Sequence, residues 1–227
     1  MASTRDIPTL VVEGNNDKFV IIELLRKHGA DMRDGFRPIE LATAKDSSTG
    51  ATGIVPLLAT MAIQIELATD RPIGFVVDVD LSCADRWAEI SKCLVATGIT
   101  PPKSCPPDGF IGRMPGRSFD CGVWMMPDCV LDHGKLEHLL KTLVPAGDPL
   151  WPLAESSTKD AKAKGAKLRD IDLIKATTHC WLAWQEEPGV PFGRAVTSNY
   201  FGHDSAEAKA FLRWLKKLFN LNGLTTI

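Results

Sequence analysis

The first half of the chain alternates apolar runs with amphipathic stretches. Apolar runs that predict β-strands occupy residues 9–14, 36–42, 73–79, 109–114 and 121–127. Apolar residues at helical spacing predict helices over residues 16–29, 53–68 and 82–98. Such alternation is typical of βαβ units on a largely parallel sheet. We therefore expect an α/β fold in which helices flank a mostly parallel sheet.

The second half of the chain is more helical. Apolar residues at helical spacing predict helices within residues 134–144, 168–185 and 205–220. Between the first two of these, residues 155–170 are polar and rich in lysine, which favours a solvated segment. We expect an α/β core in residues 1–130 and a helical part in residues 131–227 that packs on this core in one compact domain.

Composition narrows the class of protein. With 227 residues, of which 44% are hydrophobic, the chain can bury a substantial core. No stretch approaches the roughly 20 apolar residues of a membrane span, and the N-terminus lacks the apolar segment of a secretory signal. The six cysteines show neither a Cys-x-x-Cys pair nor a zinc-ribbon spacing. We expect a cytoplasmic protein, and its net charge of −2 gives no global attraction to nucleic acid.

Acidic residues follow the two clearest apolar runs. Glu13 ends "TLVVE" with Asp17 four residues later, and "GFVVDVD" ends in Asp78 and Asp80. Functional groups gather beyond the carboxyl ends of parallel strands, and side chains two residues apart on an extended chain point to the same side. Carboxylates at one edge repel each other unless a cation intervenes, and oxygen ligands suit magnesium, manganese or calcium. The pattern predicts a divalent-metal site.

Two motifs resemble the Toprim domain of topoisomerases, primases and several nucleases. One is a strand that ends in Glu-Gly with an acid four residues on, and the other is a later strand that ends in Asp-x-Asp. The series "VVDVDLSCADRW", "GVWMMPD", "GKLEHLL" and "IKATTHCWLAWQEEPG" resembles, in order, a group of small stand-alone Toprim-like proteins. These are similar to the nuclease half of the overcoming-lysogenization-defect (OLD) proteins. The resemblance covers about residues 8–219 and implies a Toprim-like sheet with a helical C-terminal extension.

The resemblance implies roles for individual residues. The metal ligands that it implies are Glu13, Asp17, Asp78, Asp80 and Glu137. Glu13 would also act as general acid or base, and Lys175 would lie near the scissile phosphate. His133 and His138 flank Glu137 and would at most line the site. Two Mg²⁺ or Mn²⁺ ions about 4 Å apart can activate water and stabilise the leaving oxygen. The implied function is a divalent-metal-dependent nuclease that hydrolyses phosphodiester bonds in DNA or RNA.

The resemblance also implies a biological setting. OLD-type nucleases act beside an ABC-type ATPase in phage defence or toxin-like activity, and the sequence has no nucleotide-hydrolysis motif, so a separate ATPase partner is expected. Two alternatives stay open: a non-catalytic Toprim module that binds nucleic acid or a protein partner, and a small RNA-processing Toprim nuclease. A phosphatase of the haloacid-dehalogenase type is disfavoured, because its Asp-x-Asp lies on the first strand. The oligomeric state, including a homo-oligomer, stays open.

Overall fold

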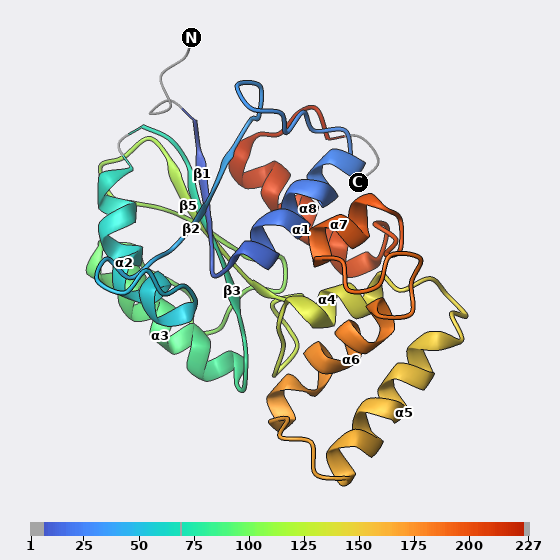
Figure 1. Cartoon of the computed structure of the whole chain (residues 1–227). Coiled ribbons are helices and arrows are strands. Elements are labelled where there is room, and N and C mark those ends of the chain that lie inside the picture. The colour runs from blue at the N-terminus through green and yellow to red at the C-terminus, as the bar shows by residue number, and fades with distance from the viewer. Residues whose placement is uncertain (1–6, 69, 225–227) are drawn as a thin grey trace.

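The computed structural model describes residues 7–68 and 70–224, which fold around a five-stranded sheet (Figure 1). The strands are β1 (Thr9–Val12), β2 (Glu40–Thr43), β3 (Ile73–Asp78), β4 (Phe110–Arg113) and β5 (Asp120–Met126). They lie in the order β2-β1-β3-β5-β4, and all neighbours are parallel except β4 and β5. The predicted α/β fold with a mostly parallel sheet is confirmed.

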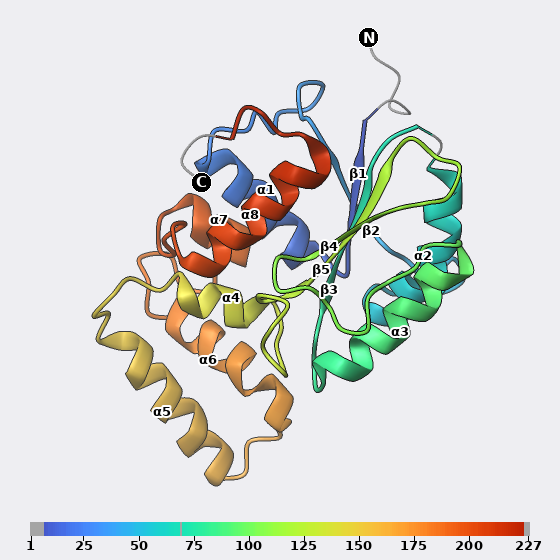
Figure 2. The same ribbon diagram turned by 180° about the vertical axis from the view of Figure 1, so that it is seen from behind.

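Helices cover both faces of the sheet. They are α1 (Asn15–Lys27), α2 (Ile54–Leu67), α3 (Cys83–Ala96), α4 (Leu136–Thr142), α5 (Leu150–Ala163), α6 (Leu173–Leu182), α7 (Phe192–Thr197), α8 (Ala206–Phe219) and the short 3₁₀ helix η2 (Asp170–Asp172). The opposite views of Figures 1 and 2 place α2 and α3 on one face, and α1 and α8 on the other. α6 packs on α4 and carries α5 on its outer side. Within the described residues, no helix combines the length and apolar content of a membrane span.

The structure contains two helices that the hydrophobic pattern does not predict. Residues 155–170 are mostly exposed, as expected for a solvated segment, but the first half of this segment is helical and belongs to α5. Alanine and lysine favour a helix there, and Trp151, Ala154 and Thr158 recur at helical spacing on its buried side. The other helix is α7, which is only six residues long and buries Phe192 and Val196. So short an element gives the 3.6-residue period too few turns to be recognised.

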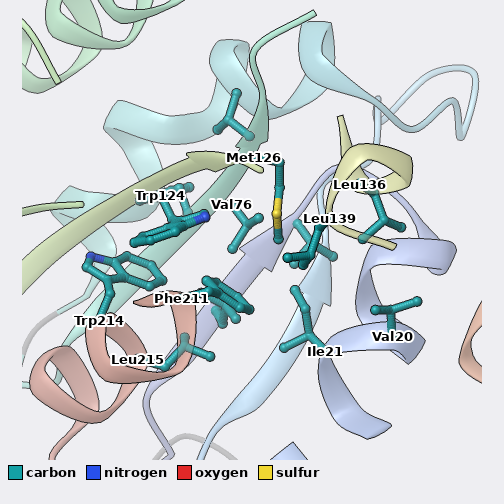
Figure 3. Packing of buried hydrophobic residues seen from close by; sticks show 14 of the residues in the cluster. Val20, Ile21, Val76, Trp124, Met126, Leu136, Leu139, Phe211, Trp214 and Leu215 are labelled. Atoms are coloured by element: carbon teal, nitrogen blue, oxygen red, sulfur yellow. The ribbon is translucent and has the colours of Figure 1, made fainter. Parts of the chain in front are cut away.

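Two glycines allow α8 to pack closely on the sheet. Gly74 of β3 and Gly122 of β5 are partners across the two strands. A Cβ atom on Gly122 would lie 2.6 Å from Cδ2 of Leu218 and 2.9 Å from Cζ2 of Trp214. A Cβ atom on Gly74 would lie 2.9 Å from the same methyl group of Leu218. The bare glycines therefore let the Trp214 ring reach the ring of Trp124, 5.8 Å away between centroids (Figure 3).

The same core fixes the start of α4. Leu136 and Leu139 are buried, and Figure 3 shows them beside Met126 of β5 and Ile21 of α1. Because these side chains anchor α4 to the sheet, the residues of its first turn are held near the end of β5. The hydrophobic core thus determines where the first-turn residue Glu137 lies.

Replacing Gly122 with alanine is expected to lower the free energy of unfolding by about 1–3 kcal/mol, because the added methyl group overpacks the contact with Leu218 and Trp214. Chemical denaturation measures this loss. Gly223→Ala is the control, since no atom lies within 4 Å of a Cβ added there. Adding Leu218→Ala should relieve the overpacking, so the double variant should lose less stability than the sum of the single variants. Additive losses would contradict the close contact.

Candidate functional site

A cavity of about 380 Å³ lies at the carboxyl ends of β1 and β3. Four carboxylates and one ammonium group line it: Glu13, Asp17, Asp78, Glu137 and Lys175. They come from the ends of β1 and β3 and from α1, α4 and α6. Five of the six residues singled out from the sequence therefore share one cavity, which we call the acidic cavity.

Backbone amides orient two of these carboxylates. The N–H of Asp78 donates to Oε1 of Glu13 at 2.7 Å, which links the end of β3 to the residue after β1. The N–H of Leu136, at the start of α4, donates to Oδ1 of Asp78 at 3.0 Å. The end of β1, the end of β3 and the first turn of α4 are thus connected through two carboxylates. Each carboxylate keeps its other oxygen for further interactions.

The other two carboxylates lie in the first turns of helices. α1 begins after Gly14, where a Cβ atom would approach Oδ2 of Asp17 to 3.3 Å, so the glycine leaves room for this carboxylate. Glu137 is only 5% exposed, and no described residue donates a hydrogen bond to its side chain or forms an ion pair with it. A buried carboxylate without a partner is costly. Glu137 is therefore a carboxylate that the described residues leave unpaired, and it lines the cavity.

Burial raises the pKa of the carboxyl groups of Glu13, Asp17 and Asp78. Desolvation, opposed by the Asp78 amide and reinforced by the nearby Asp17, raises the pKa of Glu13 to about 7. Desolvation also raises the pKa of Asp17 to about 6, with backbone hydrogen bonds opposing it and the charge of Glu137 adding to it. For Asp78, burial and then the charges of Asp17 and Glu13 raise the pKa well above its usual value. The cavity therefore disfavours the fully ionised set of carboxylates.

Asp80 lies beside the acidic cavity and not on it. β3 ends at Asp78, and Asp80 has a φ of 62°, in the left-handed region. Its N–H donates to the carbonyl of Gly134 at 2.7 Å. Its carboxylate accepts a hydrogen bond from Nη2 of Arg86 at 2.8 Å and lies 3.6 Å from Nζ of Lys135. Asp78 lines the acidic cavity and Asp80 does not, but after burial, the main cause, the charge of Asp80 still contributes to raising the pKa of Asp78 and of Glu13.

Arg86 and Lys135 are the residues at this site that the sequence analysis missed. Besides pairing with Asp80, Arg86 donates from Nε to the carbonyl of Asp78 at 3.1 Å. Lys135 also pairs with Asp172, at 3.4 Å. The sequence contains a weak signal for Arg86. A cation near the start of a helix is disfavoured by the helix dipole, so its presence there suggests a neighbouring acid. Lys135 carries no such signal apart from its place two residues before Glu137.

The donor groups of the acidic cavity fit a divalent cation, since carboxylate oxygens are the ligands that Mg²⁺ and Mn²⁺ prefer. Across residues 7–68 and 70–224, however, no three His, Cys, Asp or Glu side chains are already arranged as a metal-binding group. One oxygen each of Glu13 and Asp78 is held by a backbone amide instead. The chemistry of the cavity suits such an ion, whereas its present arrangement of side chains is not a complete site.

The raised pKa values predict that the metal-free protein loses stability as the pH rises. Glu13 and Asp17 bind protons more tightly in the folded state than in the unfolded state. Their contribution to stability is therefore complete below the unfolded pKa of about 4 and is lost between about pH 4.5 and 7.5. Each group adds a slope of at most about 1.4 kcal/mol per pH unit. Thermal melts in EDTA across this range measure the decline.

The variant Asp17→Asn separates this effect from other titrations. It removes one titrating carboxyl group and its repulsion, so the decline in melting temperature should become shallower. Asp108→Asn replaces an exposed carboxylate outside the acidic cavity and should leave the decline unchanged. Equal slopes in the wild type and in Asp17→Asn would contradict the assignment.

Comparison with known proteins gives a family and no function. A family model described as "Protein of unknown function (DUF3226)" matches residues 8–220. No curated protein and no solved structure matches the chain. The matched residues include the whole sheet, the acidic cavity and α8. Because the match spans nearly the entire chain, the protein belongs to the family of proteins of unknown function DUF3226.

Proposed function

We propose that this protein is a magnesium- or manganese-dependent nuclease that hydrolyses phosphodiester bonds in DNA or RNA. The observation that carries the proposal is the acidic cavity, where four carboxylates meet Lys175 and the buried Glu137 has no partner among the described residues. The carboxylates that would hold the ion are Glu13, Asp17, Asp78 and Glu137. When bound, the ion supplies positive charge to the phosphate and lowers the pKa of a coordinated water. The resemblance to Toprim nucleases of the OLD type supports the same assignment.

The side chains of the cavity have separable tasks in this proposal. Lys175 places an ammonium group beside Asp17 and lowers the pKa of that carboxyl group, and it can also stabilise negative charge on a phosphate oxygen. Asp78 is held in place by the N–H of Leu136, which keeps its other oxygen directed for binding. Glu13 is oriented by the amide of Asp78, so its second oxygen can accept a proton from water.

The cavity supports one ion more directly than two. The pair of ions expected from the resemblance uses Asp80, whose carboxylate is engaged by Arg86 and Lys135. These two cations lie beside the cavity and can neutralise part of the charge of a bound phosphate. A second ion stays a prediction that requires Asp80 to separate from Arg86.

A non-catalytic module is the alternative function. In that case the acidic cavity would bind an ion and organise an interface with nucleic acid or a protein, without turnover. The separate ABC-type ATPase partner, the role in phage defence or as a toxin-like effector, the RNA-processing role and a homo-oligomer stay predictions. The six free cysteines suit a reducing compartment, so we place the activity in the cytoplasm.

Mg²⁺ or Mn²⁺ is expected to raise the melting temperature relative to EDTA, because the ion binds the folded cavity preferentially. At an ion concentration of 100 times the Kd, the gain is about 2.7 kcal/mol. Asp78→Asn and Glu137→Gln should each lose most of this increment, measured by scanning calorimetry against their own EDTA baselines. Glu89→Gln, which changes an exposed partner of Arg86 outside the cavity, should keep it. Full increments in both cavity variants would contradict the proposed ion site.

Cleavage of nucleic acid is the second test. Single-stranded DNA, duplex DNA and structured RNA are incubated with Mg²⁺, Mn²⁺ or Ca²⁺, and cleavage is expected with the first two ions only, since the looser coordination of Ca²⁺ supports it poorly. Lys175→Ala should lower kcat about 100-fold and leave the thermal increment from Mg²⁺ largely unchanged. Lys92→Ala, an exposed substitution on α3, is the matched control. Stabilisation by all three ions without cleavage of any substrate would favour the binding module.

A further inference from the structure

A second hollow of about 460 Å³ lies beside the acidic cavity and differs from it in character. Its walls include the apolar side chains of Leu81, Ile171, Leu173 and Ile174 and the imidazoles of His133 and His138. Asp80, Lys135 and Asp170 add charged groups at the same hollow. We call it the histidine hollow. Leu81, which follows Asp80 in the chain, lines this hollow and is nevertheless 75% exposed. A concave, mostly apolar surface with a few polar groups is the usual form of a small-ligand site.

The histidine hollow and the acidic cavity are built from the same chain segments. Asp80 lines the hollow, two residues after Asp78 of the cavity. Ile174 lines the hollow, and the next residue, Lys175, lines the cavity. Lys135 lines the hollow directly before the first turn of α4, which lines the cavity. A polymer with one phosphate in the acidic cavity would therefore bring its neighbouring unit to the hollow.

The lining of the histidine hollow matches the chemistry of a nucleobase. A base has flat apolar faces and a polar edge, and histidine rings and aliphatic side chains are suited to stack on those faces. The rings of His133 and His138 lie 5.9 Å apart between centroids and are nearly perpendicular, at 87°, so they form a corner and not a closed stack. Asp80 can accept hydrogen bonds from the edge of a base, and Lys135 can donate them.

A third hollow, of about 480 Å³, lies next to the histidine hollow and carries charges of both signs. It shares Asp80, Leu81, Lys135 and Ile171 with the histidine hollow, and its other side is lined by Arg86 and Arg169 together with Asp85 and Glu89. Guanidinium groups bind phosphate oxygens well. A phosphate on that side would have to compete with Asp80 and Glu89, which already pair with Arg86, whereas the apolar surface with its imidazoles is suited to a base.

We propose that the histidine hollow binds one nucleobase of a single-stranded segment, next to the phosphate that enters the acidic cavity. The inference rests on the proposed function for that phosphate and specifies the substrate further. A base that stays stacked inside a duplex cannot enter a side hollow. The substrate is therefore single-stranded, or carries an unpaired base beside the scissile bond.

Abasic scanning tests the proposal. Single strands of about 12 nucleotides, in matched DNA and RNA series, carry one abasic site at successive positions. Their affinities are measured by fluorescence anisotropy in Ca²⁺, so that cleavage does not interfere. In the wild type, one position should lose affinity by about 5- to 100-fold, as expected for the loss of one stacked base, and the others should lose little. The DNA and RNA series show which sugar the site accepts.

The double variant Leu81→Ala, His133→Ala connects that position to the hollow. Both side chains are exposed, so the fold should be retained, and a thermal melt checks this. The double variant should bind the intact strand as weakly as the wild type binds the critical abasic strand. The double variant should lose no further affinity when it binds the critical abasic strand. Leu153→Ala, at an exposed leucine on the distant face of α5, should behave as the wild type.

The outcomes separate this proposal from the nuclease proposal. Binding of no strand, uniform abasic effects, or the same position-dependent loss in the double variant would each overturn the base-binding hollow, even if the protein cleaves nucleic acid. A critical position that depends on Leu81 and His133, without cleavage under any ion, would support the hollow and reject the nuclease.

Discussion

The burial of several carboxylates at one edge of the sheet, which also brings their charges together, is the constraint on which the site depends. Parallel pairing of β1 and β3 places Glu13 and Asp78 side by side, and the amide of Asp78 then fixes Glu13 directly. Burial raises the pKa of both groups, so the folded chain holds them together at a cost to its own stability. A chain tolerates such a cost where the surrounding structure determines the geometry, and this is typical of sites that bind or react.

The surrounding structure that determines this geometry is the apolar core next to the cavity. Gly122 lets α8 lie against β5, and the aromatic contact of Trp214 with Trp124 holds that strand. The end of the same strand, at Met126, meets the buried leucines of α4, which hold Glu137 in the cavity. The residues before and after position 130 thus share one hydrophobic core, because α4 and α8 complete the packing of the strands that precede them.

Much of this arrangement could be predicted from the sequence, and the exceptions have physical causes. Apolar runs that end in acids locate Glu13 and Asp78 because the carboxyl ends of parallel strands share an edge. The place of Asp80 outside the acidic cavity could not be predicted in this way, since its carboxylate pairs with Arg86, six residues later in the chain. Lys175 was assigned from a resemblance, and only the packing of α6 on α4 brings it to the cavity. The histidine hollow combines loop residues such as Leu81 and His133 with residues of α4, η2 and α6, and no periodicity along the chain reveals that they converge.

The charges beside the cavity limit how a nucleic acid can be held. Arg86 and Lys135 are already paired with Asp80, and Lys135 and Arg169 are paired with Asp172. A phosphate must compete with these carboxylates, and the net charge of −2 adds no long-range attraction. Under the proposed function, binding would therefore have to rely on contacts at short range: an ion among the carboxylates, the ammonium group of Lys175, and a base against the imidazoles. A site of the proposed kind would select a substrate by the presence of an accessible base beside the phosphate, and a uniform duplex backbone would offer it few contacts.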